Sequence, residues 1–489
     1  MTTKTTAILT LGALALLAAA PADAGTPTSL DDAALVQQIE AVLYGRGEAP
    51  EQPVRCLFPH VLEMEARGLA VAALEPVLAR ETIREYPTPE GHFVIQYWTE
   101  GTDALPDSTD ADDSGVPDYV EWVAEAMEES YQREVVELGF PFPTGGRYVV
   151  RLKRMFGGTY GLTRPFQSSF FAGSYIEINH DFEGFYRSYP DLTNDDPDGL
   201  VRGAIRVTAA HEFKHAIQLA EDWNIDSPHT QWFEVDAVWM EEVVYDQVND
   251  YYNYIRNSGS PFTSPQLSLL NSASYEDATW QMFLEQEYGI DFMLDLSERR
   301  ATERDEYFPV AYRNVALERR LVWADVWRRH AVYNYLTADR AAPSHGFTEA
   351  GNYPLAPTED IPSLPFSTEQ DFSLAPWANR FHEFDNSEGE ATGELRVVFD
   401  AEDHGDWGLS VVLQNESVTH VVPLSHDAQP DTFEVLGFDV ADFDRVGLVV
   451  GNGRTAITTS PADTYGFSVE LDDSVRAEPS SFGSLKARY

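Results

Sequence analysis

Two histidines four positions apart, in His211-Glu212-Phe213-Lys214-His215, are the residues whose types and spacing most clearly suggest chemistry. The surrounding run, VRGAIRVTAAHEFKHAIQLA, keeps apolar residues at helical spacing and predicts a helix over about 197–222. Residues four apart share one face of a helix, so both imidazoles can bind one ion, and imidazole is a good ligand for zinc. Glu212 is rotated by roughly 100° from His211, which would place its carboxylate where it can take a proton from water.

A catalytic zinc needs a third protein ligand and one open position. Glu241 and Glu242 follow downstream, in a stretch that predicts a helix over about 235–256. Without the upstream motif, these two glutamates would be interpreted as a solvated helix face. With it, the sequence resembles the gluzincin class of zinc metallopeptidases, in which a glutamate on a second helix is the third ligand.

The resemblance implies that Glu242 is this ligand. Trp239 precedes it by three positions, as in the aminopeptidase N family, and Asp246 follows it by four, as in thermolysin-like enzymes. By the same resemblance, Asp246 orients His211 through its free ring nitrogen. Lys214 departs from the pattern, because many such peptidases have an uncharged residue there.

The resemblance also implies an oxyanion donor and a strand that binds the substrate. Tyr275, at the start of an expected helix over 275–288, is the first candidate donor. The expected strand over 174–179 (SYIEIN) would be the edge strand that pairs with an extended peptide. Other candidates for the donor are Tyr251, Tyr252, Tyr254 and His229.

A second ion site is predicted in residues 110–121, DADDSGVPDYVE. The stretch matches a twelve-residue calcium loop, with glycine at position 6 and glutamate at position 12. An acidic turn without an ion is the alternative, and no clear helix precedes the loop. The expected calcium ligands are Asp110, Asp112, Ser114, Val116 through its carbonyl, Asp118 and Glu121.

Cys56 is the only cysteine, so the chain has no internal disulfide. Its surroundings, PVRCLFP, loosely resemble the cysteine-switch propeptide of matrix metallopeptidases. That resemblance implies a latency thiol that takes the fourth zinc position. A buried small hydrophobic residue is the alternative.

The expected fold class is α+β: a zincin-like catalytic domain, with a mixed sheet and active-site helices, followed by a C-terminal antiparallel β-sandwich. Short β-type runs divided by turn residues after about 390 favour the sandwich. The expected order is a signal peptide at 1–24, a helical segment and possible propeptide at 25–90, the catalytic domain at 91–340, a linker at 341–388, the sandwich at 389–475 and a tail at 476–489.

The bulk composition limits the partners. The net charge of −48 disfavours nucleic acid and anionic membranes, because phosphates are repelled. A charged start, a short apolar run at 7–20 and Ala-Asp-Ala at 22–24 are typical of a signal peptide, so we expect export without a membrane span. The oligomeric state is not indicated.

Together, these patterns predict an exported zinc endopeptidase in which Glu212 assists the attack of water on a peptide carbonyl. One alternative is a zinc hydrolase of a non-peptide amide or ester. Another is a surface adhesion or binding protein with a vestigial metal site, although such a site has no need of Glu212.

Overall fold

The computed structural model describes most of the chain between residues 32 and 472. The described residues are 32–45, 54–67, 69, 83–165, 173–183, 196–224, 230–270, 274–368, 371–402, 406–424, 431–455 and 461–472. The expected signal peptide, the expected tail and His229 lie outside these ranges.

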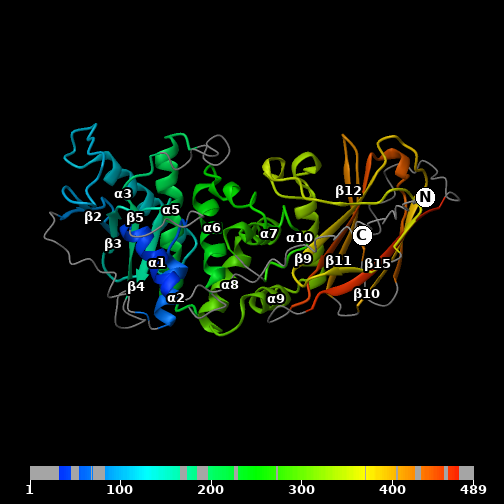
Figure 1. Cartoon of the computed structure of the whole chain (residues 1–489), viewed down its shortest axis with the longest axis horizontal. Helices are drawn as coiled ribbons and strands as arrows, with labels where there is room; N and C mark the ends of the chain where they lie inside the picture. The colour runs from blue at the N-terminus through cyan, green and yellow to red at the C-terminus, as the bar shows by residue number, and fades with distance from the viewer. Residues whose placement is uncertain are drawn as a thin grey trace, which may run out of the picture.

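The molecule is elongated, with a mixed sheet at one end, helices in the middle and two further sheets at the other end (Figure 1). This arrangement confirms the α+β class. No helix among the described residues is long and apolar enough to cross a membrane.

The first sheet has the strand order β1-β2-β3-β5-β4. Strands β2, β3 and β5 run parallel to one another, whereas β1 and β4 pair antiparallel at the two edges. The inward positions of β2 and β3 are buried apolar residues that alternate with half-buried ones, which is the pattern expected of a sheet covered on one face. The strands are β1 (Ile83–Pro87), β2 (Phe93–Trp98), β3 (Tyr148–Lys153), β4 (Gly161–Pro165) and β5 (Ser174–Asn179).

Helices pack on this sheet and against one another. Helix α5 (Leu200–Ala220) contacts β4, β5 and α3 (Asp118–Tyr131), and its other side packs on α6 (Gln231–Tyr245). The α3 helix continues as a π-helix over Gln132–Glu137. The helices that follow α6 are α7 (Thr279–Tyr288), α8 (Ile290–Thr302), α9 (Phe308–Glu318) and α10 (Trp323–Tyr335).

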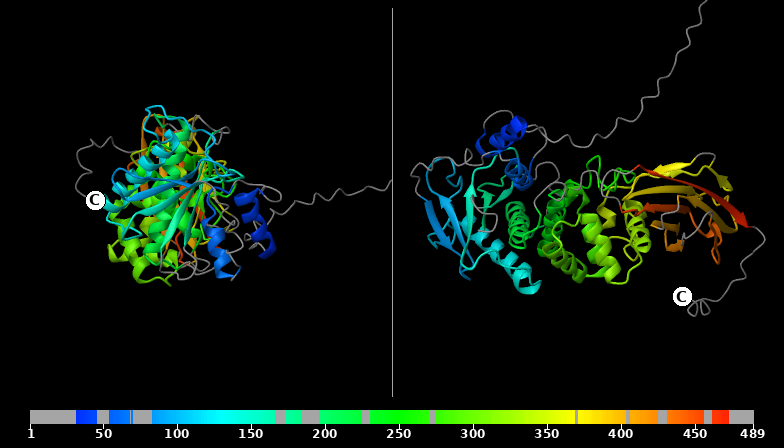
Figure 2. Two further views of the ribbon diagram at one scale, coloured as in Figure 1. Left: turned by 90° about the vertical axis from the view of Figure 1, so that its left-hand side faces the viewer. Right: turned by 90° about the horizontal axis from the view of Figure 1, so that it is seen from below.

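Two N-terminal helices lie together on one side of the molecule (Figure 2). They are α1 (Asp32–Tyr44) and α2 (Phe58–Ala66), and α2 contacts both β4 and α6. The side chains of Leu57, Phe58 and Leu62 are buried in the same core as α5 and α6. The N-terminal segment is therefore packed into the helical part of the protein.

The C-terminal part contains two sheets that share one hydrophobic core. All pairs in these sheets are antiparallel except β6 with β9, and helix α10 packs on β11 and β14. One sheet has the order β12-β11-β14-β9-β6, and the other has β13-β10-β15-β7, with β8 also paired to β15. The longer strands are β9 (Ala378–Asp385), β10 (Glu394–Ala401), β11 (Trp407–Gln414), β12 (Thr419–Leu424), β13 (Asp431–Val435), β14 (Arg445–Asn452) and β15 (Asp463–Asp472).

The segment expected to be a linker, residues 341–388, contributes strands to these sheets. It contributes β9 and the short strands β6 (Glu359–Asp360), β7 (Phe366–Ser367) and β8 (Phe372–Leu374). Its proline and serine residues suggested a linker, but backbone pairing with β14 and β15 outweighs that local composition.

Candidate active site

Helices α5 and α6 bring the two histidines of the HEFKH motif to a buried position between them. The side chains of His211 and His215 are 3% and 0% exposed, and their Nε2 atoms lie 3.1 Å apart. The i, i+4 spacing on α5 therefore places both rings at one point, as the sequence predicts.

The other ring nitrogens are held by hydrogen bonds. His211 Nδ1 lies 2.6 Å from Glu241 Oε1, and His215 Nδ1 lies 2.8 Å from Gln218 Oε1. Because the Gln218 amide nitrogen donates to Asp236, its oxygen is left to accept, so His215 Nδ1 carries the proton. This tautomer leaves the Nε2 lone pair of His215 directed at His211, which suits a metal ligand.

A carboxylate completes this cluster, and it belongs to Glu234. Its oxygens lie 3.2 Å from Nε2 of His211 and 3.2 Å from Nε2 of His215, and the sulfur of Cys56 also belongs to the group. Cys56, His211, His215 and Glu234 offer ligand atoms that all lie within 4.8 Å of one another. Burial alone would raise the pKa of Glu234, but the two histidines outweigh it and hold that pKa well below its usual range.

The structure does not bring Glu242 to the histidines, which corrects its assignment as third ligand. Its carboxyl is instead close to Glu349, Glu241 and Asp246, and burial followed by these charges raises its pKa well above the ordinary value. Asp246 is exposed and does not contact His211, whose Nδ1 is held by Glu241.

The periodicity of α6 explains this outcome. At about 100° per residue, positions seven apart lie within roughly 20° of each other, whereas positions eight apart differ by roughly 80°. Glu234 and Glu241 therefore share the face turned to α5, and Glu242 is turned away from it. The signal in the sequence was this pair of acids seven apart, although the same helix also contains Asp236 and Glu242.

Glu212 lies beside the cluster and is held by strand β4. Thr163 Oγ1 donates to Glu212 Oε2 at 2.8 Å and contacts the Glu212 carbonyl oxygen at 2.7 Å. Gly161 leaves space for the carboxylate, because a Cβ at this position would lie 2.7 Å from Glu212 Cγ. Burial raises the pKa of Glu212 and the two histidines oppose that shift, which suits a group that must take up and return a proton.

Tyr275 reaches the site from a 3₁₀-helix at Tyr275–Asp277. Its ring stacks on His211 with the centroids 5.9 Å apart, and its hydroxyl accepts a hydrogen bond from the Cys56 backbone N–H at 3.2 Å. Among the other candidates, Tyr254 stacks on Tyr275 at 4.7 Å. Tyr251 and Tyr252 pack instead with Tyr353, near Glu349.

The edge strand beside the site is β4, which corrects the expectation for residues 174–179. Those residues do form a strand, β5, with the predicted bounds, but it is paired on both sides, to β3 and β4. Strand β4 has its second edge toward the site, and residue 161 of this edge forms an isolated parallel bridge with Cys56.

Lys214 points away from the cluster. Its ammonium group lies 3.3 Å from Asp236 and 3.7 Å from the centre of the Phe140 ring, and the side chain is buried. The charge at this position is therefore compensated within the protein.

The predicted calcium loop precedes α3 and brings part of its ligand set together. Carboxylate oxygens of Asp110, Asp112 and Asp118 lie within 4.8 Å of one another. Asp110 also accepts hydrogen bonds from the backbone N–H groups of Ser114 and Gly115, at 2.9 Å each, and the Ser114 hydroxyl lies 3.3 Å from the Val116 carbonyl. Glu121 is not part of this group.

The chemistry of the histidine cluster fits a zinc ion. Two imidazole nitrogens, a carboxylate and a thiol are ligands that zinc prefers. The Glu234 carboxylate is buried against the two imidazole Nε2 atoms, so a cation between these three groups would be compensated by the negative charge and held by their lone pairs. The residues present therefore fit the ion that the sequence predicts.

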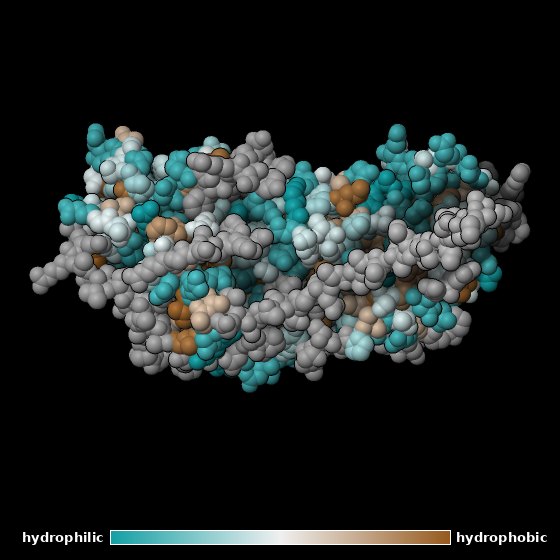
Figure 3. All heavy atoms as spheres, in the orientation of Figure 1, coloured by the Kyte–Doolittle hydropathy of each residue, from teal (hydrophilic) through white to brown (hydrophobic). Residues whose placement is uncertain are grey.

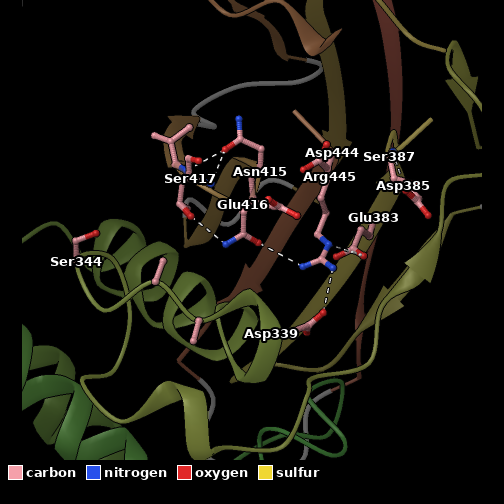
Figure 4. A pocket seen from close by; sticks show the side chains of 15 residues that line it. Asp339, Ser344, Glu383, Asp385, Ser387, Asn415, Glu416, Ser417, Asp444 and Arg445 are labelled. Atoms are coloured by element: carbon pink, nitrogen blue, oxygen red, sulfur yellow. Dashed lines mark hydrogen bonds and ion pairs between the residues drawn. The ribbon is translucent and has the colours of Figure 1, made fainter. Parts of the chain in front are cut away.

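A larger groove of about 560 Å³ is lined by residues 339–344, which follow α10, and by parts of β9, β11, β12 and β14 (Figure 4). Its central Arg445 pairs with Asp339 at 3.2 Å and with Glu383 at 3.4 Å. Acids and amides make up half of the other lining residues, and no histidine or cysteine is among the described residues that line it. The histidine cluster is therefore the stronger candidate for chemistry.

No model of a known protein family matches the sequence, and comparison with curated proteins finds no relative.

Proposed function

We propose that the chain is a zinc-dependent peptidase with a zincin-like catalytic part, and that His211, His215 and Glu234 hold the ion. The observation that carries this proposal is the convergence of two imidazole nitrogens and a buried carboxylate beside Glu212. Glu234 takes the ligand role that the positions of Trp239 and Asp246 in the sequence had assigned to Glu242.

The surrounding side chains suit hydrolysis. A zinc ion bound there would act as a Lewis acid and would lower the pKa of a water molecule. Glu212, fixed by Thr163, would take the proton of the attacking water and return it to the leaving amine. Tyr275 would donate its hydroxyl hydrogen to the developing oxyanion. Glu241 and Gln218 would hold the imidazoles in their tautomers.

The edge of β4 supports a peptide as substrate in preference to another amide or an ester. Its backbone N–H groups at Tyr160 and Gly161 donate to the Arg55 carbonyl, at 2.8 and 3.3 Å, so this edge already pairs with an extended chain. A peptide bound in the same way would pass beside Glu212.

Zinc analysis of purified variants tests the metal site. We expect about one equivalent of zinc in the wild type and much less in His215→Ala and Glu234→Gln. Zinc that stays unchanged in His215→Ala would overturn the site.

Casein hydrolysis, with and without a chelator, then tests the reaction. It is measured in an Arg55→Ala, Cys56→Ser background, because the thiol lies where water and the carbonyl must approach and the Arg55 side chain ties the same segment to Asp250. Adding Glu212→Gln should keep the zinc and lower the rate at least roughly 100-fold. If the rate is unchanged, Glu212 is not the base and the peptidase mechanism is wrong.

A further inference from the structure

Residues 54–58, here called the covering segment, cross the candidate active site. The segment lies between α1 and α2, reaches the first residue of α2, and pairs with the β4 edge at residue 161. The Thr159 hydroxyl also donates to the Val54 carbonyl. The covering segment thus occupies the backbone edge that a peptide substrate would need.

Side chains and backbone of the covering segment contact the groups proposed for the reaction. The Cys56 sulfur lies in the ligand cluster, and its backbone N–H donates to the Tyr275 hydroxyl. The Phe58 ring stacks on His215 with the centroids 4.2 Å apart. The cavity left beside His211 and Glu212 is about 20 Å³, room for roughly one water molecule and none for a peptide.

Arg55 enters a pocket next to the cluster. Its guanidinium pairs with the carboxylate of Asp250, which is 3% exposed and lies at the start of the 3₁₀-helix Asp250–Asn253. The same guanidinium lies 4.3 Å from the centre of the Tyr160 ring and 4.7 Å from that of Tyr254. A buried carboxylate and two aromatic rings match the planar, always charged arginine side chain better than any other.

Folding stability alone gives little reason for this pocket. A buried ion pair is often no more stabilising than apolar residues of the same volume, because both charges lose their hydration. Leu57 and Phe58, both fully buried, already anchor the covering segment in the core. The Asp250 pocket is therefore better explained by recognition of an arginine.

We propose that the covering segment holds the peptidase latent as a pseudosubstrate, and that the Asp250 pocket is a subsite for an arginine side chain of the substrate, next to the scissile bond. This inference rests on the peptidase function proposed above. The covering segment is not itself cleaved, because it presents a sulfur atom and not a carbonyl carbon to the cluster. The net charge of −48 also favours cationic polypeptides as substrates.

Cobalt substitution tests the role of the thiol without measuring activity. In the wild-type protein loaded with cobalt, we expect the near-ultraviolet charge-transfer absorption of a thiolate bound to the metal. Cys56→Ser should lose this absorption and still bind cobalt. Cobalt binding without the absorption in the wild type would overturn the latency proposal and leave the peptidase proposal standing. Failure to bind cobalt or zinc would instead overturn the peptidase site.

Peptide cleavage tests the subsite. The double variant Arg55→Ala, Cys56→Ser is given two peptides that differ only by arginine or glutamine at one position. We expect this double variant to cleave peptides faster than the wild type does. Its kcat/KM should be about 10- to 100-fold larger for the arginine peptide than for the glutamine peptide, which is the contribution of a charged hydrogen-bonded pair. Adding Asp250→Asn should remove this preference and keep the zinc.

Arg84→Ala is the matched control, because Arg84 is an exposed arginine on β1, at the opposite edge of the same sheet. This variant should stay as inactive as the wild type. The proposal is overturned if the double variant binds zinc but gains no activity. It is also overturned if Asp250→Asn leaves the arginine preference in place, or if Cys56→Ser loses its zinc and unfolds, since Cys56 would then be a permanent structural ligand.

Discussion

Replacing Glu241 by glutamine tests which of two adjacent glutamates supports the metal site. Glu241 Oε1 lies 2.6 Å from His211 Nδ1, and both side chains are buried. A carboxylate on the far nitrogen of a ligand histidine strengthens the ligand and fixes its ring. The amide of glutamine keeps the size of the side chain but loses the charge.

We expect Glu241→Gln to weaken zinc binding by about 10- to 100-fold, which corresponds to about 1.4–2.7 kcal/mol. Glu242→Gln is the matched control, one position along the same helix. Burial and neighbouring carboxylates raise the pKa of Glu242 well above the ordinary value, and its carboxyl does not belong to the histidine cluster. Glutamine keeps the size of this side chain, which lies outside the cluster, so the zinc affinity should stay the same.

Competition against a chromophoric chelator at fixed pH gives both dissociation constants, and thermal unfolding shows whether each variant is folded. A folded Glu242→Gln with weakened zinc binding, beside a Glu241→Gln with normal binding, would refute the arrangement described here. That result would support Glu242 as the third zinc ligand, as the sequence resemblance implies.

Three further predictions concern other parts of the chain. Gly161→Ala places a Cβ against Glu212, so hydrolysis in the Arg55→Ala, Cys56→Ser background should fall roughly 100-fold while the zinc content stays the same; an unchanged rate would show that this close approach is unimportant. Calcium at roughly 100 times its dissociation constant should raise the free energy of unfolding by about 2.7 kcal/mol in the wild type and not in Asp110→Asn, as denaturant titration can measure. Burial lowers the pKa of His330 from 6.5 to about 3, so the unfolded chain takes up a proton that the folded protein resists. The stability that this histidine contributes is complete above pH 6.5 and is lost toward pH 3, at up to roughly 1.4 kcal/mol per pH unit. His330→Phe should therefore reduce the dependence of the free energy of unfolding on pH in this range, as denaturant titration at several pH values can measure.

The regular elements followed from the sequence where local patterns were strong. The run SYIEIN forms β5 with the predicted bounds, and each β-type run expected after residue 390 forms a strand. The helix that contains His211 and His215 was also predicted, within three residues at either end. Alternation and helical spacing carry this information because burial of one face selects for them.

Glu234 was not among the sequence candidates, because the positions of Trp239 and Asp246 pointed to Glu242 and because the helix boundary was misplaced. The second helix was expected over 235–256, which begins after Glu234, whereas α6 begins at Gln231 and ends at Tyr245. Its first turn has no side-chain cap, and Trp232 and Phe233 are buried there, so tertiary packing fixes the start. The pairing of Cys56 with the β4 edge was also invisible, since no local pattern encodes contacts between segments so far apart.

The surface agrees with the composition: described residues on the face in Figure 3 are mostly hydrophilic, with apolar residues in small groups. Low mutual attraction between copies of such an acidic protein is the expected consequence.

The position of Cys56 has a consequence for biosynthesis. The thiol precedes His211 by 211 − 56 = 155 positions, so at about 5–20 residues per second it leaves the ribosome roughly 8–31 seconds before its first partner in the cluster. During this interval it has no second cysteine in its own chain with which to form a wrong bridge. Once α5 and α6 have formed, the same event that assembles the cluster also covers it. Under the latency proposed above, a producing cell is never exposed to a chain that is folded, metal-loaded and uncovered.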